Sequence, residues 1–269
     1  MKQRKTKTHA IQYFKENKAA FFTYLILRIL VVVCMVIQIF SRNYYNVFLC
    51  VLTLILFMIP VFVERRLNIK LPSALEITIL LFIFAAEILG EINAYYIHFP
   101  HWDTMLHTIN GFLMAAIGFS MIDILNQNPR VHFNMSPIFV AFVAFCFSMT
   151  IGVLWEFFEY SMDAFFLMDM QKDTLHHALS STALNPNNAN TAVVISQIQK
   201  TVVTGTVNGE QTEVLINGGY LDLGITDTIH DLIVNCIGAT AFSFFGFIYI
   251  KTRGKGRVVK NFIPQLKGE

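Results

Sequence analysis

Charge is scarce in this 269-residue chain, where charged side chains make up only 14% of the residues. Soluble domains carry about 25% charged residues, so this scarcity, beside a hydrophobic content of 55%, excludes an ordinary soluble domain. The formal net charge of +2 provides no strongly basic surface, and we therefore expect no nucleic-acid partner. The composition is that of a polytopic membrane protein, whose first partner is the lipid bilayer.

Cysteine is also rare. The four cysteines, Cys34, Cys50, Cys146 and Cys236, all fall within apolar runs, and the sequence contains neither a CxxC motif nor a cysteine–histidine metal spacing. This pattern supports neither a disulfide framework nor a zinc finger. We interpret the cysteines as small apolar side chains that fill space within the hydrophobic segments.

Long apolar runs are what the chain has instead. A helix needs about 20 apolar residues to cross the hydrocarbon core of a bilayer. The six predicted spans are 20–40, 45–63, 73–95, 103–125, 137–159 and 227–250. The expected fold is therefore an all-α, six-helix membrane bundle with basic tails at 1–19 and 251–269 and one sizeable loop at 160–226.

The lysines and arginines outside the spans predict the orientation of the chain. Sixteen of them lie in the two tails and in the segments 64–71 and 126–136, whereas the alternate segments hold only Arg42, Lys172 and Lys200. Because positive residues are retained on the cytoplasmic side, we expect a multi-pass protein of the cell membrane with both termini in the cytoplasm. The loop 160–226 then lies outside the cytoplasm.

The loop 160–226 has two halves. Residues 169–177 are polar and favour a short helix. Residues 201–207 and 210–216 alternate in a strand pattern around Asn208-Gly209, and an Asn-Gly pair supplies the positive φ angles of a type I′ turn. This pattern predicts a β-hairpin. Because an isolated hairpin is only marginally stable, we expect it to pack over the membrane helices as a lid or a docking surface.

Acidic side chains gather at one end of each of the last four spans, where they recur at the spacing of one helix face. Spans three and five run outward and spans four and six run inward, so these ends all lie at the outer leaflet. The polar residues there are Glu87, Glu91, Asp103, His107, Glu156, Glu159, Asp163, Asp227, Asp231 and Asn235. A carboxylate near hydrocarbon is costly unless it is paired, protonated or metal-bound, which predicts a single polar site. Gly111 and Gly238 follow on two of these helices and permit the close approach of a neighbour.

Metal binding is the first chemistry that fits this site, because carboxylates with imidazole suit Zn²⁺, Mn²⁺ or Fe²⁺. The expected ligands are His107, Asp103, Glu156 and Asp231. The candidate catalytic residues are Glu159, Glu156 and Asp231, with Glu159 as a general base, while Asn235 orients a ligand. The expected cofactor is a divalent metal ion, which activates water against a lipid-linked or amphiphilic envelope substrate reached from the outer leaflet.

Two alternatives stand beside this hypothesis. Crowded carboxylates can relay protons or cations, so an ion- or solute-translocating protein would use Glu87, Glu159 and Asp231. The inner halves of spans four to six hold few polar residues, which counts against translocation. In the other alternative the acids only cap helix ends, where Asp103 and Asp227 suit the helix dipole, and the protein is a non-catalytic scaffold whose loop binds an envelope partner.

Several of these motifs resemble a known family. Asp103-xxx-His107 with Gly111, the distal Trp155-Glu156, the segment 170–174 and the run 227–239 are similar to the YjdF-like family of bacterial inner-membrane proteins, and more distantly to the VanZ-like (teicoplanin-resistance) family. The likeness covers roughly spans three to six, and the long hairpin-bearing loop departs from the VanZ-like pattern. The resemblance implies a bacterial plasma-membrane location and no particular reaction.

Overall fold

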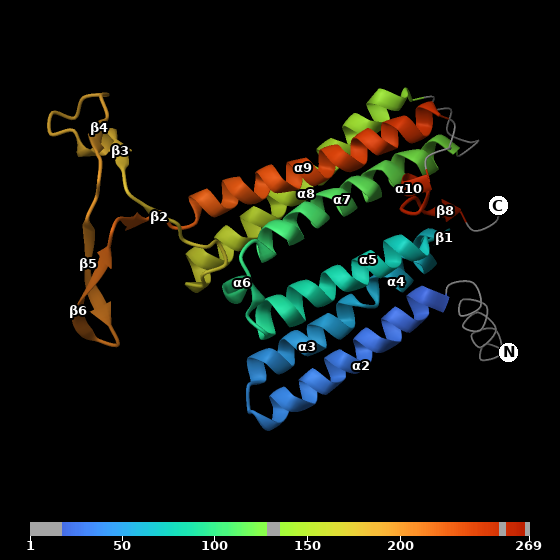
Figure 1. Cartoon of the computed structure of the whole chain (residues 1–269), viewed down its shortest axis with the longest axis horizontal. Coiled ribbons are helices and arrows are strands. Elements are labelled where there is room, and N and C mark those ends of the chain that lie inside the picture. The colour runs from blue at the N-terminus through green and yellow to red at the C-terminus, as the bar shows by residue number, and fades with distance from the viewer. Residues whose placement is uncertain (1–17, 128–134, 253–256, 267–269) are drawn as a thin grey trace. The chain divides into compact units, whose positions relative to one another are not determined.

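The computed structural model describes residues 18–127, 135–252 and 257–266 (Figure 1). The basic residues of 1–17, together with Arg130, Arg253, Lys255 and Lys267, lie outside the described residues. The chain divides into two compact units. The first, which we call the helical unit, comprises Met1–Val153 and Asp231–Glu269, and the second, the loop unit, comprises Leu154–His230.

Six helices among the described residues are long and apolar enough to cross a membrane, as the sequence predicts. They are Lys18–Phe40, Tyr44–Arg66, Ser73–Ile92, Trp102–Leu125, Pro137–Phe166 and Ile225–Lys251. The first span is α2 (Lys18–Phe40), and the last three belong to α7 (Trp102–Gln127), α8 (Pro137–Phe166) and α9 (Ile225–Lys251). The protein is therefore a polytopic helical membrane protein.

The second and third spans are each built from two segments. The second joins α3 (Tyr44–Leu56) to α4 (Ile59–Leu67), with a proline in the first turn of α4. Proline lacks a backbone N–H and cannot continue a preceding helix, which separates the two segments. The third span joins α5 (Ser73–Phe84) to the π-helix η1 (Ala85–Ile92), followed by the short α6 (Tyr95–His98).

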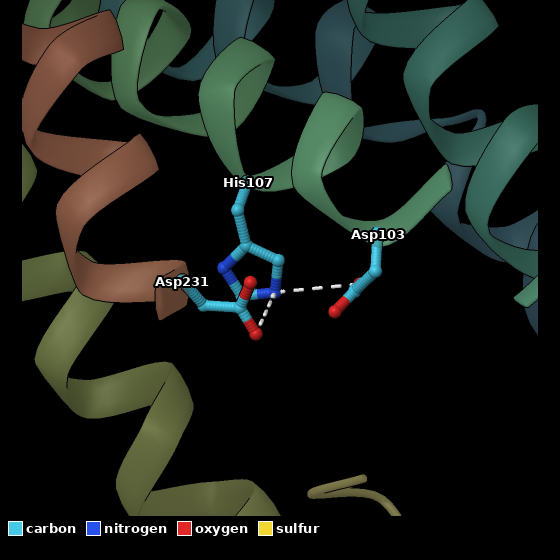
Figure 2. Close-up of side chains that lie close together, drawn as sticks. All are labelled: Asp103, His107 and Asp231. Carbon is cyan, nitrogen blue, oxygen red and sulfur yellow. Dashed lines mark ion pairs between the residues drawn. The ribbon is translucent and has the colours of Figure 1, made fainter. Parts of the chain in front are cut away.

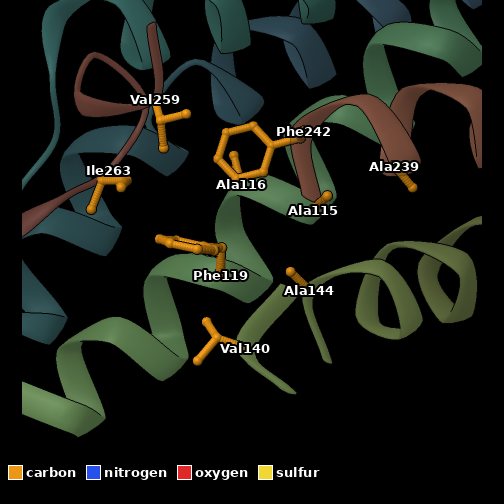
Figure 3. Packing of buried hydrophobic residues seen from close by; sticks show 9 residues of the cluster. All are labelled: Ala115, Ala116, Phe119, Val140, Ala144, Ala239, Phe242, Val259 and Ile263. Atoms are coloured by element: carbon orange, nitrogen blue, oxygen red, sulfur yellow. The ribbon is translucent and has the colours of Figure 1, made fainter. Parts of the chain in front are cut away.

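Two of the apolar cores in the helical unit each pack three helices together. One joins α2, α3 and α5 through Val31, Cys50, Phe57 and Leu80, all fully buried. The full burial of Cys50 agrees with its interpretation as an apolar side chain. The other core joins α7, α8 and α9 and is shown in Figure 3; its buried members are Ala115, Ala116, Phe119, Val140, Ala144, Ala239, Phe242, Val259 and Ile263.

Two glycines set the spacing of α7 and α9. A Cβ atom at Gly238 would overlap the carbonyl oxygen of Thr108, and one at Gly111 would overlap the carbonyl oxygen of Asn235. The backbones of the two helices are therefore in direct contact, and the prediction that these glycines permit a close approach is confirmed.

Residues 257–266 pack against other parts of the helical unit. The segment contains α10 (Arg257–Lys260) and β8 (Gln265–Leu266), and β8 pairs antiparallel with β1 (Ile69–Lys70). Val259 and Ile263 are buried in the core of α7, α8 and α9. Part of the stretch that the sequence analysis treats as a basic tail is thus a packed element, because its apolar residues are spaced among the basic ones.

The loop unit contains three antiparallel strand pairs. β2 (Leu175–His176) pairs with β7 (Tyr220–Leu221), and β3 (Leu179–Ser181) pairs with β4 (Val193–Ile195), with the 3₁₀ turn η2 (Thr182–Leu184) between β3 and β4. β5 (Lys200–Val207) and β6 (Glu210–Asn217) form the predicted hairpin. Asn208 and Gly209 have φ angles of 52° and 87°, as a type I′ turn requires. The role of the hairpin as a lid or a docking surface stays a prediction.

The short helix predicted within 169–177 is wrong, since the structure describes this whole segment as bends, extended chain and β2. The physical reason is that its backbone N–H groups donate to carboxylates outside the segment. Those of Met170 and Gln171 donate to the two oxygens of Asp163, at 2.7 and 2.8 Å. That of Lys172 donates to Asp227 at 2.7 Å. Carboxylates thus take the N–H groups that a helix would use.

Candidate metal-binding site

The site is built where α7 begins. Asp103 lies in the first turn of this helix, where the positive end of the helix dipole favours an anion. His107 follows one turn later on the same face. Gly111 lies one further turn along α7 and contacts the backbone of Asn235 on α9. Because Asp231 is one turn before Asn235, this contact brings Asp231 beside His107.

The carboxylates of Asp103 and Asp231 both lie near the same ring nitrogen of His107 (Figure 2). The Nε2 atom of His107 lies 3.6 Å from Oδ1 of Asp103 and 3.7 Å from Oδ2 of Asp231. Each distance exceeds the 2.7–3.2 Å of a typical N–H···O hydrogen bond. One ligand atom from each residue can be chosen so that all three lie within 4.8 Å of one another. Two ligands of a tetrahedral zinc ion lie roughly 3.3–3.6 Å apart, and the two distances from Nε2 of His107 are close to this value.

Burial differs sharply across the group. The side chain of Asp231 is 1% exposed and that of His107 is 8% exposed, whereas that of Asp103 is 35% exposed. The site therefore opens at Asp103 and is closed at Asp231. A buried carboxylate in a membrane span is costly without a compensating partner or a metal ion, and the adjacent histidine and a cation are both suited to this role.

A polar layer one turn further along the helices ties the bundle together. The amide of Asn110 donates to Oδ1 of Asn235 at 3.2 Å, joining α7 to α9. The hydroxyl of Ser148 on α8 donates to the carbonyl of Gly111 at 2.7 Å. A Cβ atom at Gly152 would lie 2.8 Å from the Asn235 amide nitrogen, so this glycine makes room for the asparagine.

Asn235 acts on the site through its contacts with α7 and α8. Asn235 is fully buried, and its hydrogen bonds run to Asn110, to the carbonyl of Ser148 and to the sulfur of Met149. These contacts fix the helices that carry the candidate ligands. Ser148 was missed by sequence reasoning, although the four-residue spacing of Ser148 and Gly152 is the small-residue pattern typical of packed membrane helices.

Glu87 and Glu91 lie elsewhere in the helical unit. Both are on the π-helix η1, and both interact electrostatically with Tyr45 near the start of α3. Glu91 is exposed and Glu87 is partly buried. Among the described residues, the group that suits a metal ion contains neither glutamate. The structure thus gathers Asp103, His107 and Asp231, while this pair of glutamates lies beside α3.

The remaining predicted site residues belong to the loop unit. Glu156 and Glu159 are buried, at 4% and 8% exposure, and Glu159 accepts a 2.8 Å hydrogen bond from the indole of Trp155. Asp163 accepts hydrogen bonds from the backbone N–H groups of Met170 and Gln171, and Asp227 accepts one from that of Lys172. Both carboxylates thus hold the backbone of a non-helical segment. The assignments of Glu156 as a ligand and of Glu159 as a general base stay predictions.

Asp222 is the strongest polar anchor that sequence reasoning missed. Its side chain is 4% exposed and accepts hydrogen bonds from the backbone of Thr174, Gly224 and Thr226. It also lies 3.0 Å from Nε2 of His176. Burial favours the neutral acid, but hydrogen bonds from Thr226, Thr174 and His176 outweigh it and hold the pKa of Asp222 well below its usual range. The signal in the sequence is an aspartate just before a helix start.

Comparison with known proteins places this architecture in a family. A family model described as "Predicted membrane protein (DUF2238)" matches residues 22–252, a range that includes Asp103, His107 and Asp231. No curated protein matches the chain, and no solved structure matches it. The matched range covers most of the chain and reaches into all six spans. The chain therefore belongs to the DUF2238 family of predicted membrane proteins.

Proposed function

We propose that Asp103, His107 and Asp231 bind one divalent metal ion and that the protein is a metal-dependent enzyme of the bacterial cell envelope. One observation carries the proposal: Nε2 of His107 lies 3.6 and 3.7 Å from two carboxylate oxygens. These distances are longer than hydrogen bonds and close to those between two ligands of one cation. Imidazole with carboxylates suits Zn²⁺, Mn²⁺ or Fe²⁺.

The geometry supports catalysis as well as binding. Three protein ligands leave a coordination position open for water or substrate, and a divalent ion there makes bound water a nucleophile near neutral pH. Asp103, the most exposed of the three residues, marks the side from which a substrate enters.

The location of the site suggests its substrate. From the distribution of lysine and arginine we place both termini in the cytoplasm and the start of α7 at the outer leaflet of the plasma membrane. A site at that depth meets amphiphilic or lipid-linked envelope molecules. The resemblance to the YjdF-like and VanZ-like families supports the choice of Asp103, His107 and the α9 motif as site residues. It implies no particular reaction.

The packing beyond the polar layer favours an enzyme over a translocation pathway. The core of α7, α8 and α9 contains fully buried alanine and phenylalanine side chains. The hydroxyl of Ser120 in this region donates to the carbonyl of Ala116 at 2.6 Å, so it is engaged by its own helix. Along this core the described residues form a largely apolar interface, which is a poor path for ions.

The hairpin favours a second candidate function, a scaffold that binds an envelope partner. Its valine and leucine side chains are about half exposed, which is unusual for apolar residues in a folded hairpin. These residues are Val202, Val203, Val207, Val214 and Leu215. Under this second function, the acidic residues at the helix ends have only structural roles, and the helical unit binds no metal.

Metal content decides between the two candidates. We would purify the full chain in detergent, incubate it with Zn²⁺, Mn²⁺ or Fe²⁺, and measure bound metal by mass spectrometry. Wild type is expected to hold one ion per chain, and the His107→Ala and Asp231→Asn variants are expected to lose it. His98→Ala is the matched control, because His98 is an exposed histidine outside the group. Folded wild type that binds none of these metals would overturn the proposal and leave the scaffold.

A further inference from the structure

A cavity of about 300 Å³ lies between α5, α7 and α9. Its volume is at the lower end of the range for small-molecule sites. Its walls include Thr78, Thr108, Phe112, Gly238, Ala241 and Phe262. Phe262 comes from the packed end of the chain and meets Phe112 edge to face, with ring centroids 5.2 Å apart.

The walls of the cavity are apolar even where threonines form them. The hydroxyl of Thr78 donates to the carbonyl of Ala74 at 2.8 Å, and that of Thr108 donates to the carbonyl of Thr104 at 2.7 Å. Each hydroxyl is thus engaged by its own helix, as threonines in apolar helices often are. The other wall side chains are hydrocarbon. The cavity therefore suits an apolar occupant and gives water few partners.

The cavity adjoins the candidate metal-binding site. Thr108 directly follows His107 on α7, and Gly238 lies two turns beyond Asp231 on α9. Ala241 lies about 15 Å along α9 from Asp231, at 1.5 Å per residue. The same two helices therefore present a polar group at one end and a hydrocarbon-lined hollow next to it, within the depth of one bilayer leaflet. This is the polarity of a single amphiphile.

We propose that the cavity holds one alkyl chain of an amphiphilic substrate whose polar head group lies at Asp103, His107 and Asp231. The position of the head group rests on the proposed function, whereas the position of the chain rests on the cavity alone. The proposed substrate is therefore a molecule with an extended hydrocarbon chain.

Photolabelling tests the position of the chain. The probe is hexadecanol with a diazirine in mid-chain, whose uncharged head makes the label report on the chain. It is irradiated with the full-length protein in detergent, and labelled residues are mapped by mass spectrometry. In wild type we expect labels on α7 and α9 between residues 108 and 112 and between 237 and 241, and loss of these labels when unlabelled hexadecanol is added in excess.

Two variants at α9 sharpen the test. Ala241→Phe fills the cavity and is expected to abolish labelling there. Phe244→Trp is the matched control, because Phe244 is 59% exposed on the same helix and its replacement leaves the cavity open. Labels spread over exposed apolar faces, without competition, would overturn the inference. If Ala241→Phe fails to fold, competition in wild type alone decides.

The His107→Ala variant separates this inference from the proposed function. It is expected to lose metal and to keep the competable labels in the cavity. Wild type that labels in the cavity but binds no metal would refute the enzyme and retain the chain site. Wild type that binds metal but labels without competition would retain the metal site and refute the chain site.

Discussion

Replacing Gly238 by alanine is the sharpest test of how the site is assembled. A Cβ atom there would overlap the carbonyl oxygen of Thr108 and would lie 2.9 Å from the backbone nitrogen of Phe112. Both neighbours are backbone atoms of α7, so neither can rotate away as a side chain would. The added methyl group can be accommodated only if α7 and α9 separate.

Two opposing effects set the magnitude. Alanine favours a helix over glycine by about 1 kcal/mol, so helix propensity alone predicts a more stable variant. Overpacking of a close contact costs about 1–3 kcal/mol, and a clash with backbone belongs at the upper end. The Gly238→Ala variant is therefore expected to lose about 2 kcal/mol of unfolding free energy, which corresponds to a melting temperature lower by about 4–8 °C.

The assay is thermal unfolding in detergent, with metal content measured on the same sample. The variant keeps all three candidate ligands, but separation of α7 from α9 would move Asp231 away from His107, and we expect weaker metal binding. Gly205→Ala is the control, since a Cβ atom there would meet no described atom within 4 Å. A Gly238→Ala protein as stable as wild type, or more stable, would refute the direct contact of the two backbones.

Three further predictions concern other contacts. Asn235→Ala is expected to lower stability by about 1 kcal/mol, as interhelical hydrogen bonds in membranes do, and a double-mutant cycle with Asn110→Ala would show coupling in thermal unfolding. Because the pKa of Asp222 is lowered on folding, its stabilisation is present above a pH of about 3.9 and is lost only as pH falls through the lower folded value. The backbone amides of residues 174–176 are therefore expected to exchange equally slowly at pH 7 and pH 5, once the rates are corrected for the intrinsic pH dependence of exchange. In the Asp222→Asn variant they are expected to exchange fast at both pH values. Gly209→Val, at a φ of 87°, is expected to destabilise the hairpin by about 1–2 kcal/mol and to speed exchange in β5 and β6; unchanged exchange would contradict the turn.

Local signals account for the parts of the fold that the sequence predicts well. Span length and apolar composition suffice for the six helices, and Asn208-Gly209 suffices for the hairpin turn. The pairing of Asp103 with His107 follows from helix spacing. The structure places Asp231 beside His107, because Gly111 and Gly238 let the backbones of α7 and α9 meet. The role of Asp231 as a ligand stays a prediction.

Other parts depended on features that a regular helix pattern does not contain. The spacing argument assumes 3.6 residues per turn, but Glu87 and Glu91 lie on the π-helix η1, which has i→i+5 hydrogen bonds and a different number of residues per turn. The helix predicted within 169–177 failed because distant carboxylates bind its backbone. Asp222 lies in a short connection, where helix or strand periodicity gives no signal, and only its position just before the start of α9 marks it in the sequence.

The strand pair β2–β7 joins the two ends of the segment that contains β3, β4, β5 and β6. In this pair His176 is opposite Tyr220. Nearby, the side-chain amide of Gln171 donates a hydrogen bond to the hydroxyl of Thr228 at 2.5 Å. The residues before β3 and after β6 are therefore linked to each other. The entropy of closing a loop grows only slowly with its length. We therefore expect insertions or deletions within residues 179–217 to leave the pairing of β2 with β7 unchanged.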